Sequence, residues 1–309
     1  MAVEVTAKMV KELRELTGSG IMDCKKALIA TDGDIQAAVE HLRKQGLALA
    51  NKKAGRVAAE GLCAYKISDD AKKAIVVEVN SETDFVAKND LFKGFVENVA
   101  NQVMASSAET VDELKNEPWI ENPNETVGEA LVEKVAVIHE NMQIRRFARV
   151  ESDSYIGGYL HGAGRIAVLV SVSCDVVNDE LKKVVKNLCM QVAGLNPSFL
   201  SKETVDAEWL AKETEIYKDQ IKLDPKMASK PEQVIAKILE GKLNARFKEV
   251  CLMEQDYFLG EGSVKNYVEQ AAKTVGAPIT VNGYVRFETG EGIEKKQENF
   301  AEEVAKQMQ

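Results

Sequence analysis

The residues with the clearest potential for chemistry lie together at positions 83–89, which read TDFVAKN. They include an acid, an aromatic ring and a base within five positions: Asp84, Phe85 and Lys88. An apolar run at 75–80 predicts a buried strand before this motif, and apolar residues at helical spacing predict a helix over 91–103. The motif therefore occupies a strand-to-helix junction, where side chains often project from a rigid scaffold.

Two interpretations of this junction compete. In the first, Thr83 or Asn89 caps a helix and Phe85 is buried in the core. In the second, Phe85 is a contact residue for a partner. If a single helix ran on from Val86, its apolar stripe would recur at Asn89 and Asp90, which are both polar. Phe85 therefore falls outside the stripe, which favours the second interpretation.

The composition of the chain excludes several classes of function. Its 309 residues carry a formal net charge of −9, and an acidic chain without long basic runs is poorly suited to binding nucleic acid. The N-terminus has no apolar signal region, and no apolar run approaches the roughly 20 residues that span a bilayer. We therefore expect a cytoplasmic protein that binds neither nucleic acid nor membranes.

Catalytic and metal chemistry is poorly represented. The five cysteines are scattered and form no CxxC pair, which fits a reducing compartment and argues against disulfides or a zinc site. With three histidines, and no P-loop, GxGxxG or HExxH motif, the chain offers no convergent set of titratable groups. We expect no catalytic residues, metal, cofactor or direct nucleotide binding, and the features that remain favour an interaction protein.

The elements that must position the motif predict an α+β fold. Residues 1–56 predict an N-terminal three-helix bundle of the ubiquitin-associated type, which is a docking module. Its third helix is expected over 35–45 and closed by Gly46. Ile21 and Met22, beside glycines, resemble the exposed apolar loop by which such bundles bind partners, although Met22 could equally be a core residue.

The rest of the chain predicts a core of two duplicated sheet-plus-helix subdomains and two additions. Core subdomain N covers 57–152, and core subdomain C covers 153–197 together with 249–289, including a strand expected over 250–259. The additions are an inserted helical hairpin at 198–248 and a C-terminal helical module at 290–309. The hairpin could form a homodimer, or it could pack on its own subdomain.

The two copies match in their helices and differ at the junction. A constant offset pairs Asn89 with Asn178 and Gln102 with Gln191. The second copy reads SCDVV where the first reads TDFVAK, so it lacks the acid–aromatic pair. A shared fold explains the matches, and the mismatch points to a function in the first copy only.

Two stretches of the chain resemble signatures of the bacterial elongation factor Ts family. One is the motif at 83–89 with Glu78, Val79 and Asn80 before it, and the other reads TGSGIMDCKKAL at 17–28. The resemblance implies a guanine-nucleotide exchange factor that releases GDP from elongation factor Tu so that GTP can bind. Such a factor breaks no bond in the nucleotide, and therefore needs no catalytic acid, base or cofactor.

The resemblance also implies roles for particular residues. Asp84 and Phe85 would insert near the partner's switch and magnesium region, and Thr83, Val86 and Lys88 would bind the partner with them. Ile138 and His139 would press on a neighbouring helix of the partner, although this family often has glycine at the second position. His161 would contact the partner's third domain. The N-terminal module would dock on the nucleotide-binding domain through five residues: Lys11, Leu13, Ile21, Met22 and Lys25.

Two other classes of function are compatible with parts of the sequence. A ubiquitin-associated-type adaptor would bind its partner through the N-terminal bundle and use the rest of the chain as a scaffold. A cysteine-dependent enzyme would use Cys24 or Cys174 as its nucleophile.

Overall fold

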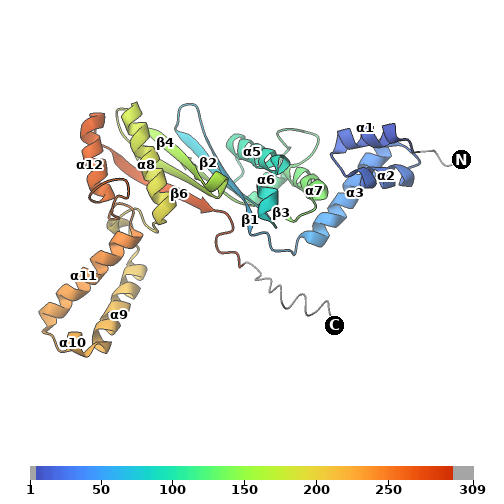
Figure 1. Cartoon of the computed structure of the whole chain (residues 1–309). Coiled ribbons are helices and arrows are strands. Elements are labelled where there is room, and N and C mark those ends of the chain that lie inside the picture. Colours follow the sequence, from blue (N-terminus) through green and yellow to red (C-terminus); the bar gives the residue numbers. More distant parts are fainter. Residues whose placement is uncertain (1–4, 295–309) are drawn as a thin grey trace. The chain divides into compact units, whose positions relative to one another are not determined.

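The computed structural model describes residues 5–294, while residues 1–4 and 295–309 are not described. The described chain has an α+β fold, as predicted, and forms two units that each contain a three-stranded sheet (Figure 1). The first unit takes in residues up to 66, 75–148 and from 287 onward, and the second takes in 67–74 and 149–286. Of the C-terminal helical module expected at 290–309, residues 295–309 lie outside the described residues.

Three N-terminal helices form a bundle, which confirms the predicted N-terminal helices: α1 (Ala7–Thr17), α2 (Ile21–Ala30) and α3 (Ile35–Lys53). The local capping signals explain where they begin and end. Thr6 Oγ1 accepts a hydrogen bond from Met9 N at 3.3 Å, and Asp34 Oδ1 accepts one from Ala37 N at 3.0 Å. Gly18 ends α1 in the left-handed conformation, with φ 67°. The core of the bundle is small and apolar, and it includes Val10, Leu13, Cys24 and Leu28.

The third helix is longer than predicted, because Gly46 does not end it. This glycine is buried in mid-helix, where a Cβ would lie 3.0 Å from Ala136 Cβ of α7 (Val127–Ile138). Glycine weakens a helix interior by about 1 kcal/mol relative to alanine, but here it allows α3 to approach α7 closely. The expectation of a helix end at Gly46 was wrong because close packing of the two helices, and not a turn, requires the glycine.

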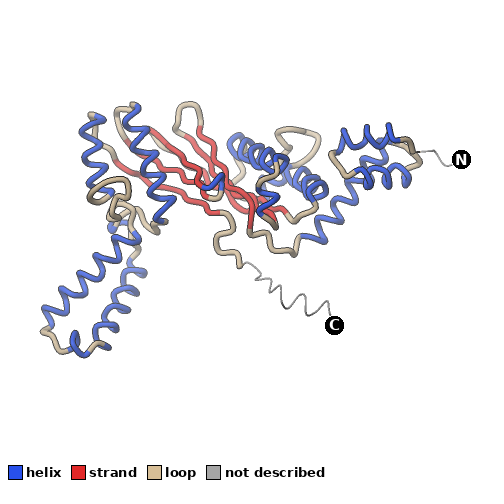
Figure 2. Tube along the Cα trace, in the orientation of Figure 1, coloured by secondary structure: helices blue, strands red, loops and turns tan. Residues whose placement is uncertain are grey.

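The first sheet has the order β1–β2–β3, formed by β1 (Glu60–Ile67), β2 (Lys73–Ser81) and β3 (Met142–Glu151). Figure 2 distinguishes these strands from the helices of the unit, α5 (Asp90–Ala105), α6 (Val111–Asn116) and α7. Strand β2 is buried at eight successive positions, so its neighbours cover both of its faces. The face of α5 carrying Phe92, Phe95 and Val99 joins residues of β2 and α7 in one apolar core.

A buried carboxylate links the first sheet to the last described residues of the unit. Glu78 of β2 is fully buried and accepts hydrogen bonds from Arg145 at 2.9 Å, Arg146 at 2.6 Å and Gly290 N at 2.8 Å. Asn80 Nδ2 adds a fourth bond at 3.0 Å. Burial alone would raise the pKa of Glu78, but the hydrogen bonds from Gly290, Asn80 and the two arginines hold that pKa below its ordinary value.

The second unit repeats the plan of the first with β4 (Tyr155–His161), β5 (Ile166–Ser173) and β6 (Thr280–Glu288). Strands β4 and β5 are antiparallel, and their register pairs Tyr155 with Val172 and His161 with Ile166. The short helix η1 (Gly162–Gly164) joins them, and the helices α8 (Asp179–Leu195) and α12 (Val264–Val275) complete the apolar core.

A buried glutamine holds the same kind of loop in both units. Gln102 of α5 accepts a hydrogen bond from Ile120 N at 2.9 Å, and Gln191 of α8 accepts one from Phe258 N at 3.1 Å. These are the two glutamines that the constant offset between the two copies pairs. The duplication itself remains an inference from the sequence, and this shared arrangement supports it.

Residues 198–250 form mainly helices: η2 (Lys202–Thr204), α9 (Ala207–Leu223), α10 (Pro225–Ala228) and α11 (Glu232–Val250). Helices α9 and α11 contact each other through Arg246 and Glu213, at 3.6 Å, and through Lys242 Nζ, 5.4 Å from the centre of the Tyr217 ring. The strand expected over 250–259 was wrong, because α11 continues to Val250 and turns follow it. Within residues 5–294, none of the helices is both long and apolar enough to cross a membrane.

We predict that Gly46→Val lowers the free energy of unfolding by about 2 kcal/mol, because the larger side chain overpacks the contact between α3 and α7. Gly94→Val is the matched control, since Gly94 is an exposed glycine inside α5 whose added Cβ would meet no atom within 4 Å. Urea unfolding measures both variants. Equal stability of the two variants would contradict this role of Gly46.

A second prediction concerns acid stability. Glu78→Gln should lower the free energy of unfolding by about 3 kcal/mol near neutral pH, because two arginines lose the counter-charge they share. The folded-state pKa of Glu78 lies below its unfolded value, so the carboxylate contributes fully above the ordinary pKa of about 4.3. Its contribution is lost as the pH falls through the folded value. Urea unfolding across this range should therefore show the difference between the two proteins shrinking in acid, and a constant difference would refute the assignment.

Candidate partner-binding site

The strand-to-helix junction displays Phe85 outside the core. Between β2 and α5 the chain forms one helical turn, α4 (Asp84–Ala87), in which Phe85 is 78% exposed and Val86 is buried. Asn89 Oδ1 accepts a hydrogen bond from Leu91 N at 2.8 Å and so caps α5, as predicted. The core interpretation of Phe85 was therefore wrong. Val86 anchors the turn from inside, and its burial leaves it little surface for direct contact.

Two opposite charges flank the exposed ring. Lys88 Nζ lies 2.6 Å from Asp84 Oδ2 and 5.7 Å from the centre of the Phe85 ring. The hydrogen bond from Lys88 lowers the pKa of Asp84, so the acid stays ionised. The turn thus presents a carboxylate, an ammonium group and an aromatic ring to solvent as one small mixed surface.

Thr83 anchors the turn through a contact that was not predicted. Its side chain makes no capping hydrogen bond to α4. Instead, Thr83 N donates to Glu140 Oε2 at 2.9 Å and Thr83 Oγ1 donates to Glu140 Oε1 at 2.7 Å. One carboxylate from the loop between α7 and β3 therefore holds both polar groups at the start of α4.

A second carboxylate makes the reciprocal contact. Asn141 N donates to Glu82 Oε1 at 2.6 Å, and Arg56 lies 3.4 Å from Glu82 Oε2. Asn141 Nδ2 donates to Arg56 O at 2.7 Å. We call residues 82–85 and 138–141 the paired loops, because an acid of each binds the backbone of the other. The structure thus brings together the Asp84–Phe85 pair and the Ile138–His139 pair, which were predicted separately.

His139 ends α7 in an unusual backbone conformation. Its φ of 61° and ψ of 28° lie in the left-handed region, where glycine is the favoured residue. The ring is exposed, with Nε2 3.9 Å from Asp23 Oδ2, while the neighbouring Ile138 packs against the core. The buried Lys53 at the end of α3 donates to His139 O at 2.6 Å, a favourable place for a cation at a helix C-terminus.

The docking residues of the N-terminal bundle divide into exposed and buried positions. Ile21 and Met22 are exposed, at 55% and 61%. Lys11, Ile21 and Lys25 also line a shallow groove of about 390 Å³. Leu13 is fully buried in the bundle, so its assignment as a docking contact was wrong: its helical spacing reflects the core.

The remaining predicted contact lies in the second unit. His161 is exposed at the end of β4, and its Nδ1 lies 3.1 Å from Tyr159 OH. This pairing orients the imidazole ring at the turn that leads into η1.

The sequence does not single out the residues that support the paired loops. Glu82, Glu140 and Lys53 show no unusual spacing, and Glu140 is 57 positions from Thr83. The two loops come together because β2 and β3 are neighbours in the sheet, and not because they are close in sequence. The available sequence signal was an acidic residue close to each predicted contact pair. Acidic residues are too common in the chain for this signal to indicate a role.

Nucleophilic and metal chemistry receives no support from the described part of the chain. Cys24 and Cys174 are buried, and a buried thiol is poorly placed to act as a nucleophile. Burial raises the pKa of Cys63 and of Cys189 to about 12. Residues 5–294 contain no group of three or more potential metal ligands among histidine, cysteine and acidic side chains.

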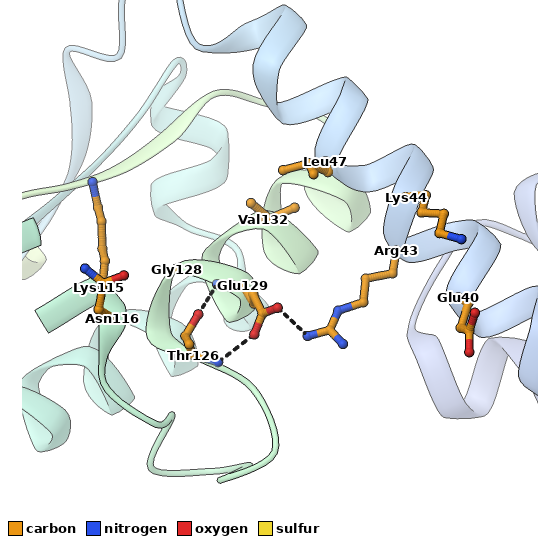
Figure 3. A pocket seen from close by; sticks show the side chains of 10 residues that line it. All are labelled: Glu40, Arg43, Lys44, Leu47, Lys115, Asn116, Thr126, Gly128, Glu129 and Val132. Carbon is orange, nitrogen blue, oxygen red and sulfur yellow. Dashed lines mark hydrogen bonds and ion pairs between the residues drawn. The ribbon is translucent and has the colours of Figure 1, made fainter.

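One pocket lies away from the predicted contacts. It measures about 480 Å³ and lies between α3, α6 and α7, with Leu47 and Val132 among its lining residues (Figure 3). Arg43 reaches from α3 to Glu129 of α7, at 3.1 Å. None of the predicted contact residues lines this pocket, whereas Lys11, Ile21 and Lys25 line the groove of the N-terminal bundle.

Comparison with known proteins identifies relatives over nearly the whole chain. The family described as "Elongation factor TS" matches residues 82–291. A protein named Elongation factor Ts from Clostridium novyi (strain NT) is 51% identical over 306 residues, which cover 98% of this chain and 99% of that protein. Proteins of the same name from Clostridium botulinum (strain Eklund 17B / Type B) and Clostridium perfringens (strain SM101 / Type A) are each 50% identical. Those alignments cover 98% of this chain, and 99% and 98% of the two relatives, respectively.

We predict that His139→Gly raises the free energy of unfolding by about 0.5–1 kcal/mol, because glycine adopts the left-handed conformation without steric strain. His139→Ala is the control: it removes the same ring but keeps a Cβ in the strained conformation. Urea unfolding should rank the glycine variant above both the wild type and the alanine variant. A glycine variant no more stable than the alanine variant would show that backbone strain is not relieved here.

Proposed function

The chain belongs to the elongation factor Ts family and so acts in translation elongation, and on that premise we propose that it releases GDP from elongation factor Tu so that GTP can bind. The observation that carries this proposal is the exposure of Phe85 at an anchored turn. Transfer of this large apolar side chain from water into a pocket of a partner is favourable, and it therefore contributes binding free energy.

Phe85 and Asp84 act together at the partner's switch and magnesium region. The ring serves as a wedge, and the neighbouring carboxylate is available for polar groups displaced by it. Displacing the groups that hold Mg²⁺ removes charge neutralisation from the phosphates, and the nucleotide is then bound less tightly. Thr83 and Lys88 hold the wedge in place, and Val86 anchors it from the core.

The other contacts supply binding free energy. Ile138 and His139 press on a helix of the partner beside the wedge, and His161 contacts its third domain. The N-terminal bundle docks on the nucleotide-binding domain through four exposed residues: Lys11, Ile21, Met22 and Lys25. Exchange factor and nucleotide each weaken the binding of the other by the same factor, because linkage between two ligands of one protein is reciprocal.

The helical hairpin formed by α9, α10 and α11 is a second interaction surface in this proposal. Its exposed apolar residues include Ile216, Leu223 and Val234. Two copies of the chain could bury these side chains against each other and so form a homodimer.

Phe85→Ala should slow stimulated GDP release at least about tenfold, because burial of a phenylalanine side chain is worth more than the free energy that corresponds to one decade in rate. Stopped-flow release of fluorescent GDP from elongation factor Tu, at saturating exchange factor, measures this rate. Leu259→Ala is the control, since Leu259 is also an exposed apolar residue, at 50% against 78%, and lies outside the proposed contact surfaces.

Three outcomes of this experiment would count against the proposal. A wild-type chain that binds elongation factor Tu without accelerating release would be an adaptor and not an exchange factor. A Phe85 variant as fast as the wild type would refute the wedge. A Leu259 variant as slow as the Phe85 variant would show that the assay reports general loss of apolar surface.

A further inference from the structure

The turn that carries Phe85 is too short to hold its own orientation. Helix α4 has four residues, and isolated helices much longer than this are only marginally stable in water. It also lacks a side-chain cap. Its position therefore depends on tertiary contacts, of which the structure supplies two: the buried Val86 and the two hydrogen bonds between Thr83 and Glu140.

These two hydrogen bonds are strong for a site at the surface. Both are charge-assisted, at 2.9 and 2.7 Å, and the carboxylate that accepts them is half-buried. Glu140 lies between His139 and Asn141, whose carbonyl and N–H are themselves bound by Lys53 and Glu82. The loop that carries Glu140 is thus fixed by α3 and by the residue that directly follows β2, so it can act as a rigid support for α4.

We propose that Glu140 is a positioning residue for nucleotide exchange, which acts by holding Thr83 so that Phe85 is presented in a fixed orientation. This inference rests on the proposed function. Preorganisation of this kind lowers the entropy lost when the wedge enters its partner. Because Glu140 also adjoins Ile138 and His139, the paired loops approach the partner as one body.

The lysine at the end of α3 extends this coupling to the docking module. Lys53 is buried and donates to the carbonyl of His139, so a hydrogen bond joins the end of α3 to the paired loops.

Three variants test the proposal. Glu140→Ala removes both hydrogen bonds to Thr83. Glu140→Gln removes the charge but keeps the geometry, since an amide oxygen can accept from the backbone N–H while the amide nitrogen donates to the hydroxyl. Glu97→Ala is the matched control: it removes the same kind of charge from an exposed position of α5, away from the paired loops. The first readout is the rate of fluorescent-GDP release at saturating exchange factor, measured beside the affinity for elongation factor Tu.

We expect Glu140→Ala to slow release about tenfold, with affinity changed less than about threefold, because two charge-assisted hydrogen bonds are lost while the docking residues remain. Glu140→Gln should recover most of the rate, and Glu97→Ala should match the wild type. A second readout needs no partner: hydrogen exchange at the Thr83 amide should accelerate at least about tenfold in Glu140→Ala and should stay unchanged in Glu97→Ala.

A double-mutant cycle separates positioning from a direct contact. If Glu140 acts through Phe85, then Glu140→Ala should add little to the loss already caused by Phe85→Ala. Additive losses would overturn the proposal, as would a Glu140→Ala variant that releases GDP at the wild-type rate, or a Glu140→Gln variant as slow as Glu140→Ala. A wild-type chain that fails to accelerate release would instead refute the proposed function itself, and the positioning role with it.

Discussion

The pairing of β2 with β3 is the constraint on which the candidate site depends, and the buried Glu78 is the contact that holds it. Arg145 and Arg146 of β3 both bind this carboxylate. Beyond the sheet, Glu82 meets Asn141 and Thr83 meets Glu140, so the partners run in opposite directions along the chain. A shift in this register would move the two acids away from the amides they bind, and the support for α4 would be lost.

The local features of the fold were predictable from the sequence, because each depends on a few neighbouring residues. Thr6, Asp34 and Asn89 all cap the helices that follow them, as helix capping by polar side chains requires. The exposure of Phe85 was also foreseeable, since its position falls outside the apolar stripe of α5.

The predictions that were wrong concern features that depend on residues far apart in the chain. Gly46 resembles a helix end in sequence, but its role depends on Ala136 of α7, 90 positions later. Leu13 has the spacing of either a core or a contact residue, and only the packing of three helices decides between them. The carboxylate of Glu140 has no local signature at all, because its two partners belong to another loop. The contacts between the paired loops therefore could not be predicted from the sequence, whereas the motif that they support could.

The structure has a consequence for how far the paired loops can vary in sequence. Glu82 and Glu140 each accept a hydrogen bond from a backbone N–H, of Asn141 and Thr83 respectively. Every amino acid except proline supplies that donor. For these two backbone contacts, selection therefore falls mainly on the two acids. The side chains of Thr83 and Asn141 are constrained separately, because each donates a further hydrogen bond, to Glu140 and to Arg56 O respectively. Neighbouring surface positions can then adapt to a diverging partner without loss of the scaffold that presents them.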